Sequence, residues 1–74
     1  MKLETYLLES KEKYVLIKDK NKLLIASGNP KELFVRLSAF ILKNEIVEII
    51  QEIDDFFPYS VIIDCEVFIN VSKR

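Results

Sequence analysis

The chain has 74 residues, of which 50% are hydrophobic and 31% charged, and its formal net charge is −1. This length predicts a single domain, residues 1–74, and the high hydrophobic fraction excludes an intrinsically disordered chain. With no His and one Cys, the sequence excludes a disulfide framework, a cysteine-based metal site and histidine-dependent hydrolysis within one chain. We therefore expect a protein that is not an enzyme, with no catalytic residues, no metal and no cofactor.

The apolar stretches of the chain fit neither a leader nor a membrane anchor. Glu4 and Glu9 interrupt the N-terminal apolar residues, which is not typical of a signal peptide. Residues 33–42 contain Arg36 and are far shorter than the roughly 18 residues of a membrane span. We expect a soluble, intracellular, cytoplasmic protein, and the abundance of Ile and Lys fits an AT-rich genome, a thermophile or a virus.

The N-terminal third predicts strands. Residues 2–9 are ambiguous: Leu3, Tyr6 and Leu7 fit one face of a helix, but we favour a strand. Residues 13–27 predict a β-hairpin, because apolar runs at 14–17 and 23–26 flank a turn-forming segment at 19–22 that contains Asp and Asn.

The middle of the chain predicts a long helix. Asn29 suits the N-cap, and Pro30 suits the first helical position because its missing N–H would be unpaired there. Apolar residues then recur at alternating spacings of four and three, at Val35, Ala39, Leu42, Ile46, Ile49, Ile53 and Phe56. This apolar stripe predicts one helix over residues 30–56, about 40 Å long. The alternative is a break at residues 43–44, with Asn44 capping a second helix.

Residues 59–71 alternate along two faces and predict a strand about 43 Å long, nearly as long as the helix. A right-handed crossover would place this strand parallel to the strand that precedes the helix. The predicted fold class is α+β with two layers, in which an antiparallel or mixed sheet of three or four strands packs on one long helix. The predicted order of elements is β(β)β-α-β, with residues 2–9 as a strand or a helix.

The first half of the predicted helix carries a second apolar group, on a different side from the stripe. One sheet covers one side of a helix, so this group needs cover from residues 1–9, from a kink at Asn44 or from a partner. We favour a second copy of the chain in a two-fold dimer, because small chains often gain core by self-association. The predicted interface consists of Leu33, Phe34, Leu37, Phe40 and Ile41.

Charge is divided between the two halves of the chain. Residues 1–43 carry 9 basic and 5 acidic side chains, whereas residues 44–72 carry 7 acidic and no basic ones. The predicted basic hairpin, which can meet phosphates or protect a sheet edge, consists of Lys11, Lys13, Lys18, Lys20 and Lys22. The predicted acidic surface, which is solvated or faces a protein partner with a basic surface, consists of Glu45, Glu48, Glu52, Asp54 and Asp55.

Three residues near the C-terminus have simple structural interpretations. Asp64 and Glu66 share a face of the predicted strand, where a lysine of the hairpin is a simpler partner than a catalytic role. Cys65 is expected to be a buried small hydrophobic residue rather than a nucleophile.

The leading hypothesis is a small non-enzymatic protein-interaction module, a homodimer that presents the acidic surface and the basic hairpin to macromolecular partners. One alternative is a small acidic inhibitor from a mobile element that blocks a basic nucleic-acid-binding groove. Another is a weak nucleic-acid-binding protein that uses the lysines of the hairpin.

Overall fold

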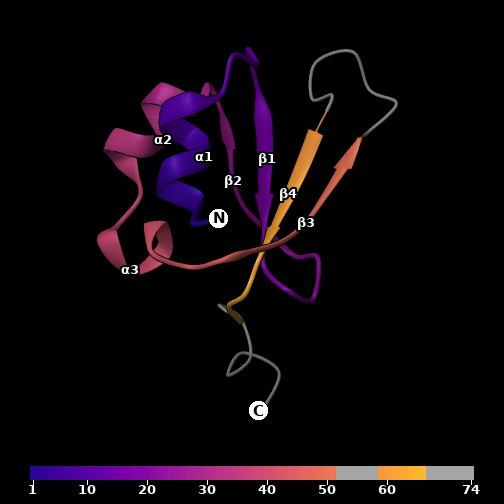
Figure 1. Cartoon of the computed structure of the whole chain (residues 1–74). Coiled ribbons are helices and arrows are strands. Elements are labelled where there is room, and N and C mark those ends of the chain that lie inside the picture. Colours follow the sequence, from indigo (N-terminus) through magenta and orange to yellow (C-terminus); the bar gives the residue numbers. More distant parts are fainter. Residues whose placement is uncertain (52–58, 67–74) are drawn as a thin grey trace.

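The structure is a computed structural model that describes residues 1–51 and 59–66. Its elements are α1 (Leu3–Glu9), β1 (Val15–Lys18), β2 (Leu24–Gly28), α2 (Pro30–Arg36), α3 (Ala39–Leu42), β3 (Ile46–Gln51) and β4 (Tyr59–Ile63). The four strands form one mixed sheet in the order β2-β1-β4-β3, and the three short helices lie together on one side of it (Figure 1). The predicted α+β class and mixed sheet are thus confirmed.

The hydrophobic core lies between the helices and the sheet. Val15 and Ile17 are fully buried and alternate along β1 with half-buried residues, as expected for a strand with one face on the core. The buried core cluster consists of Leu3, Leu7, Val15, Ile17, Leu33, Leu42, Val61 and Ile63. Every described element except β2 and β3 contributes to it, so the core depends on contacts between distant parts of the chain.

Residues 3–9 form a helix, not the strand that we favoured. Leu3 and Leu7 are both 0% exposed. They are four residues apart, so they lie on the same face of α1 and both point into the core. The helical alternative at this segment is therefore the one that the structure adopts.

The predicted hairpin is confirmed. β1 and β2 pair antiparallel, with Val15 opposite Gly28. The turn between them is organised by Asp19, whose side chain is buried and whose Oδ1 accepts the backbone N–H groups of Asn21 and Leu23, both at 2.9 Å. Lys22 has a φ of 68°, the left-handed conformation that lets the chain return into β2.

The start of α2 is also as predicted. Asn29 Oδ1 accepts the backbone N–H of Lys31 at 2.9 Å and that of Glu32 at 3.4 Å, and Pro30 occupies the first turn. Gly28, just before the cap, has a φ of +146°, which a residue with a Cβ rarely adopts. The chain therefore turns sharply from β2 into α2.

The predicted helix over residues 30–56 is wrong. α2 ends at Arg36, α3 has four residues, and residues 46–51 form strand β3. Ile53 and Phe56, the last residues of the predicted stripe, lie outside the described residues. The stripe is not one buried face either, because Val35 is 80% exposed whereas Leu42 is 8% exposed.

Local hydrogen bonds explain where the helices stop. Ser38 Oγ caps the start of α3 by accepting the N–H of Ile41 at 3.4 Å. The side-chain amide of Asn44 donates to the carbonyl oxygens of Phe40 at 2.9 Å and Ile41 at 3.2 Å. These bonds give partners to carbonyl groups that the C-terminal end of α3 would otherwise leave unpaired. The alternative break at residues 43–44 is thus present. However, Asn44 closes a helix instead of opening one, and the β-branched residues that follow suit a strand.

The last predicted strand is shorter than expected. β4 ends at Ile63, and the part of the prediction over residues 67–71 lies outside the described residues. β4 runs parallel to β1, with Val61 opposite Ile17, and antiparallel to β3. Because β1 and β2 are antiparallel, β4 is not parallel to the strand that precedes the helices, so this detail of the prediction is wrong.

Candidate functional site

The five residues of the predicted interface lie on α2, on the turn after it and on α3. Leu33 is 1% exposed and belongs to the core, so it is not available to a partner. Phe34, Leu37 and Ile41 are half-buried and pack against the core cluster. Phe40 is 73% exposed, so of the five it is the residue that the structure presents most fully.

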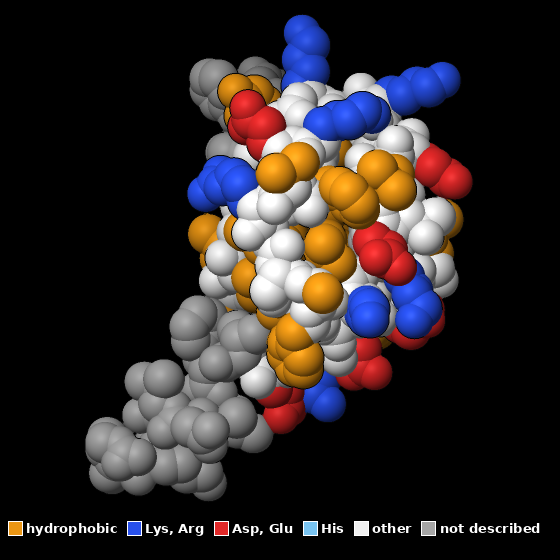
Figure 2. Space-filling view, turned by 90° about the vertical axis from the view of Figure 1, so that its left-hand side faces the viewer, with side chains coloured by type: hydrophobic (Ala, Val, Ile, Leu, Met, Phe, Trp, Pro, Cys, Tyr) orange, Lys and Arg blue, Asp and Glu red, His pale blue; other side chains and the backbone are white. Residues whose placement is uncertain are grey.

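Two further hydrophobic residues are exposed on the helices, and the sequence interpretation did not assign them to the interface. Val35 on α2 is 80% exposed and Leu8 on α1 is 51% exposed. We call Leu8, Val35 and Phe40 the helical patch, since each of the three helices contributes one of them. Figure 2 looks onto this side of the molecule and shows hydrophobic side chains running down its middle, with charged side chains around them. Exposed apolar side chains that form a contiguous patch mark interaction sites in soluble proteins.

A shallow, wide-open depression lies on the outer surface of α2 beside Val35. The depression has a volume of about 500 Å³ and is lined by Lys31, Glu32, Val35 and Arg36. Lys31 also bridges to α1, because its Nζ donates to the carbonyl oxygen of Leu8 at 3.4 Å. The helical patch is therefore bordered on α2 by charges of both signs.

Of the predicted acidic surface, the structure describes Glu45 and Glu48. Glu45 binds the N-terminal amine of Met1 at 3.2 Å, and Glu48 is exposed on β3. Glu52, Asp54 and Asp55 lie outside the described residues. Within residues 1–51 and 59–66, no three acidic or cysteine side chains are close enough to hold a metal ion.

The lysines of the basic hairpin fall into two groups at opposite ends of β1. Lys11 and Lys13 precede the strand, whereas Lys18, Lys20 and Lys22 lie at its far end and in the turn. The five lysines therefore do not all lie at one end of the hairpin.

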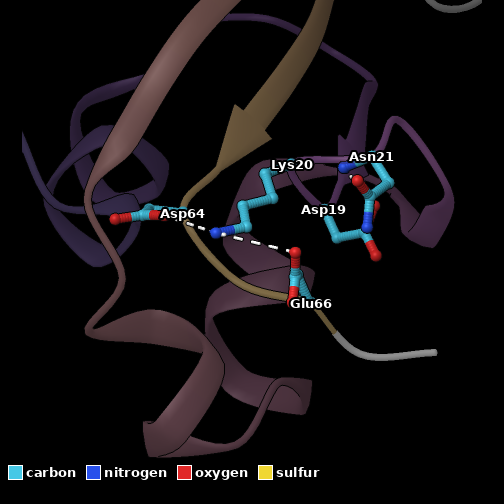
Figure 3. A network of polar contacts seen from close by, with 5 residues as sticks. All are labelled: Asp19, Lys20, Asn21, Asp64 and Glu66. Carbon is cyan, nitrogen blue, oxygen red and sulfur yellow. Dashed lines mark hydrogen bonds and ion pairs between the residues drawn. The ribbon is translucent and has the colours of Figure 1, made fainter. Parts of the chain in front are cut away.

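Lys20 is already engaged with the segment after β4. Its Nζ lies 3.9 Å from Asp64 Oδ1 and 3.6 Å from Glu66 Oε2 (Figure 3), and its backbone N–H donates to the Cys65 carbonyl at 2.9 Å. A hairpin lysine as partner of the two carboxylates is thus confirmed. Because these side chains are largely exposed, each ion pair contributes only about 0–1 kcal/mol, and the cluster positions the turn against residues 64–66.

Cys65 is half-buried and packs against the core, as a small hydrophobic residue does. Burial raises the pKa of its thiol, and the carboxylates of Asp19 and Asp64 raise it further, while Lys20 opposes them. The thiolate is the reactive form, so this environment suppresses nucleophilic chemistry at neutral pH.

We expect the alkylation of Cys65 to reach its half-maximal rate at a higher pH in the folded protein than in the protein unfolded by urea. The rate with iodoacetamide, followed by mass spectrometry across pH, gives both midpoints. The midpoint is compared rather than the rate, because restricted access alone slows the reaction at every pH. A folded-state midpoint at or below the unfolded one would contradict the assigned environment.

Comparisons with protein-family models, with curated proteins and with solved structures find no match for this chain. No helix in the described ranges is long and apolar enough to cross a membrane. Among the described surfaces of the chain, the helical patch contains the most exposed large hydrophobic side chains, Val35 and Phe40.

Proposed function

We propose that the protein is a small non-enzymatic interaction module that forms a two-fold homodimer through the helical patch. The observation that carries this proposal is the exposure of three large hydrophobic side chains, one on each helix of the same layer: Leu8 at 51%, Val35 at 80% and Phe40 at 73%. Burying them in a second copy removes apolar surface from water, which is the main driving force of association.

The centre of the opposite face of the sheet offers little apolar surface to a partner. Ile62 alternates along β4 with the core residues Val61 and Ile63, so it points to the side without helices. There it is only 3% exposed, and Ser60 on the same face is 0% exposed. The centre of that face is therefore already covered, which favours the helical side as the interface.

The charges beside Val35 suit pairing with an identical surface. In a two-fold interface the same residues meet in both directions. If two copies of α2 lie antiparallel near Val35, Glu32 of each copy comes opposite Arg36 of the other. Such exposed pairs add little affinity, but they favour one register over others.

The size of the chain is compatible with such a dimer. The whole chain exposes 5134 Å². A standard interface covers about 800 Å² on each partner, which is roughly one sixth of that surface. A chain of this length also buries a smaller fraction of its surface than a larger domain, so it gains stability from the second copy.

We expect Val35→Glu and Phe40→Glu each to weaken the dimer by at least about 100-fold, because a buried carboxylate without a partner costs several kcal/mol and each change occurs twice. Sedimentation velocity over a range of concentrations measures the effect. Leu24→Glu on β2 is the matched control, since Leu24 is 51% exposed outside the helical patch and its substitution leaves the mass unchanged. Leu37 and Ile41 are less suitable because they also pack against the core.

A second pair of variants tests the charge arrangement. Glu32→Arg places like charges opposite each other and weakens the dimer, and the double variant Glu32→Arg with Arg36→Glu restores it. Circular dichroism confirms that each variant is folded. A folded Val35→Glu, Phe40→Glu double variant that keeps the dimeric mass would contradict the proposal.

A further inference from the structure

The strand β3 forms one edge of the sheet, with β4 as its sheet neighbour. Two of its hydrophobic side chains are well exposed, Val47 at 61% and Ile49 at 45%. In the described part of the chain, only residues 1–3 make backbone hydrogen bonds to the outer side of this edge, and they reach no further than Ile46. Residues 47–51 therefore form an extended backbone whose outer side is not paired with any other described residue.

The N-terminal residues show how this edge is used. Lys2 lies opposite Glu45 in an antiparallel bridge. The N–H of Leu3 donates to the Asn44 carbonyl at 2.9 Å, and the N–H of Ile46 donates to the Met1 carbonyl at 2.8 Å. The chain just before β3 thus already accepts an antiparallel extended segment at residues 44–46. The register of β3 with β4 shifts between Ile46 and Glu48, so a separate segment placed ahead of Met1 would pair with residues 47–51 in the register that follows this shift.

The charge of the edge indicates what kind of segment fits. Exposed edge strands are usually protected from pairing by Lys or Pro, and β3 contains neither. Its one charged residue is Glu48, which is exposed. Glu45, which lies just before β3, binds the positive N-terminal amine of Met1 through its Oε1 at 3.2 Å. A second copy of β3 would bring carboxylates toward carboxylates, whereas a basic segment neutralises them.

We propose that residues 47–51 bind an extended basic peptide segment of a partner protein by antiparallel strand addition. Backbone hydrogen bonds provide the affinity, Glu48 selects positive charge, and Val47 and Ile49 provide apolar contacts. This site lies on the sheet edge, and the helical patch lies on the three helices. The homodimer and the peptide site can therefore be tested independently, because a variant with Val35→Glu retains the edge at residues 47–51.

The probe is a capped seven-residue peptide of alternating Lys and Val, added to the full chain. We expect slower amide hydrogen exchange within residues 47–51, measured residue by residue by NMR, and no change at β2, the opposite edge of the sheet. The control peptide has the same sequence with alternate backbone nitrogens methylated, so it keeps the charge but cannot complete the hydrogen bonds. We expect it to give no protection.

The charge requirement is tested with Glu48→Lys. We expect this variant to bind the Lys–Val peptide at least about fivefold more weakly, and to prefer a Glu–Val peptide of the same length. Failure of the Lys–Val peptide to bind, equal binding of the methylated peptide, or protection at β2 instead of β3 would overturn the proposal. Protection of residues 47–51 that rises with protein concentration alone would also overturn it, in favour of self-pairing of the edge.

Discussion

Leu7→Ala is expected to lower the free energy of unfolding by about 2–5 kcal/mol, the range for truncating a buried leucine in a packed core. Leu7 is 0% exposed and contributes to the core from α1 together with Leu3. The substitution removes the buried atoms and leaves a cavity between the helix and the sheet. In a domain of this size the loss is a large part of the total stability.

Leu8→Ala is the matched control for this prediction. Leu8 is the next residue along the chain but is 51% exposed, so its truncation is expected to change stability by less than about 0.5 kcal/mol. Urea unfolding followed by circular dichroism measures both variants, below the concentration at which the wild-type protein associates. Equal losses for the two variants would contradict the burial of Leu7 in the core and the exposure of Leu8.

Asp19→Ala is expected to lower the free energy of unfolding by about 1.5–3 kcal/mol. The carboxylate accepts the backbone N–H groups of Asn21 and Leu23, both at 2.9 Å, within a turn that also carries the left-handed residue Lys22. Alanine leaves both donors without this acceptor. The two hydrogen bonds are part-buried, and a hydrogen bond to a charged group contributes about 1.5–3 kcal/mol.

Asp19→Asn keeps an oxygen at the same position and is expected to lose less than half as much stability as the alanine variant. Hydrogen exchange adds a local measurement, because the amides of Asn21 and Leu23 become less protected in the alanine variant while those of α1 keep their order of protection. If alanine and asparagine destabilise equally, the negative charge of Asp19 matters more than its hydrogen bonds to the turn.

The parts of the fold that the sequence predicted correctly depend on short-range rules. The hairpin follows from two apolar runs around a turn with Asp19, and the start of α2 follows from Asn29 and Pro30. In each case the hydrogen bonds that decide the structure join residues within four positions of each other. Such signals can be interpreted without knowing what packs against the segment.

The segment over residues 46–51 shows where this approach fails. Its apolar residues fit the helical spacing of the preceding stripe, but they are β-branched and also suit a strand. Pairing with β4 decides between the two, with Ile49 opposite Val61, and this partner lies beyond residues 52–58 in the sequence. Tertiary pairing of this kind overrides local periodicity.

The wrong prediction of one long helix also affects part of the predicted interface. The apolar stripe predicts that Val35 packs on a sheet and that Leu33 faces a partner. Because α2 ends at Arg36, the stripe does not form, and the two residues exchange roles: Leu33 is in the core and Val35 is exposed. Phe40 was assigned to the partner side and is exposed as expected, whereas Leu8 could be found only once residues 3–9 were known to form a helix.

The most direct test of the proposed homodimer is an isotope-filtered NMR experiment on a mixture of labelled and unlabelled chains, at a concentration where light scattering gives the mass. The account predicts a mass of two copies of the 8.7 kDa chain, with intermolecular contacts from the Val35 methyl groups and the Phe40 ring. A mass of one copy at high micromolar concentration, or a dimer whose intermolecular contacts exclude both residues, would contradict it.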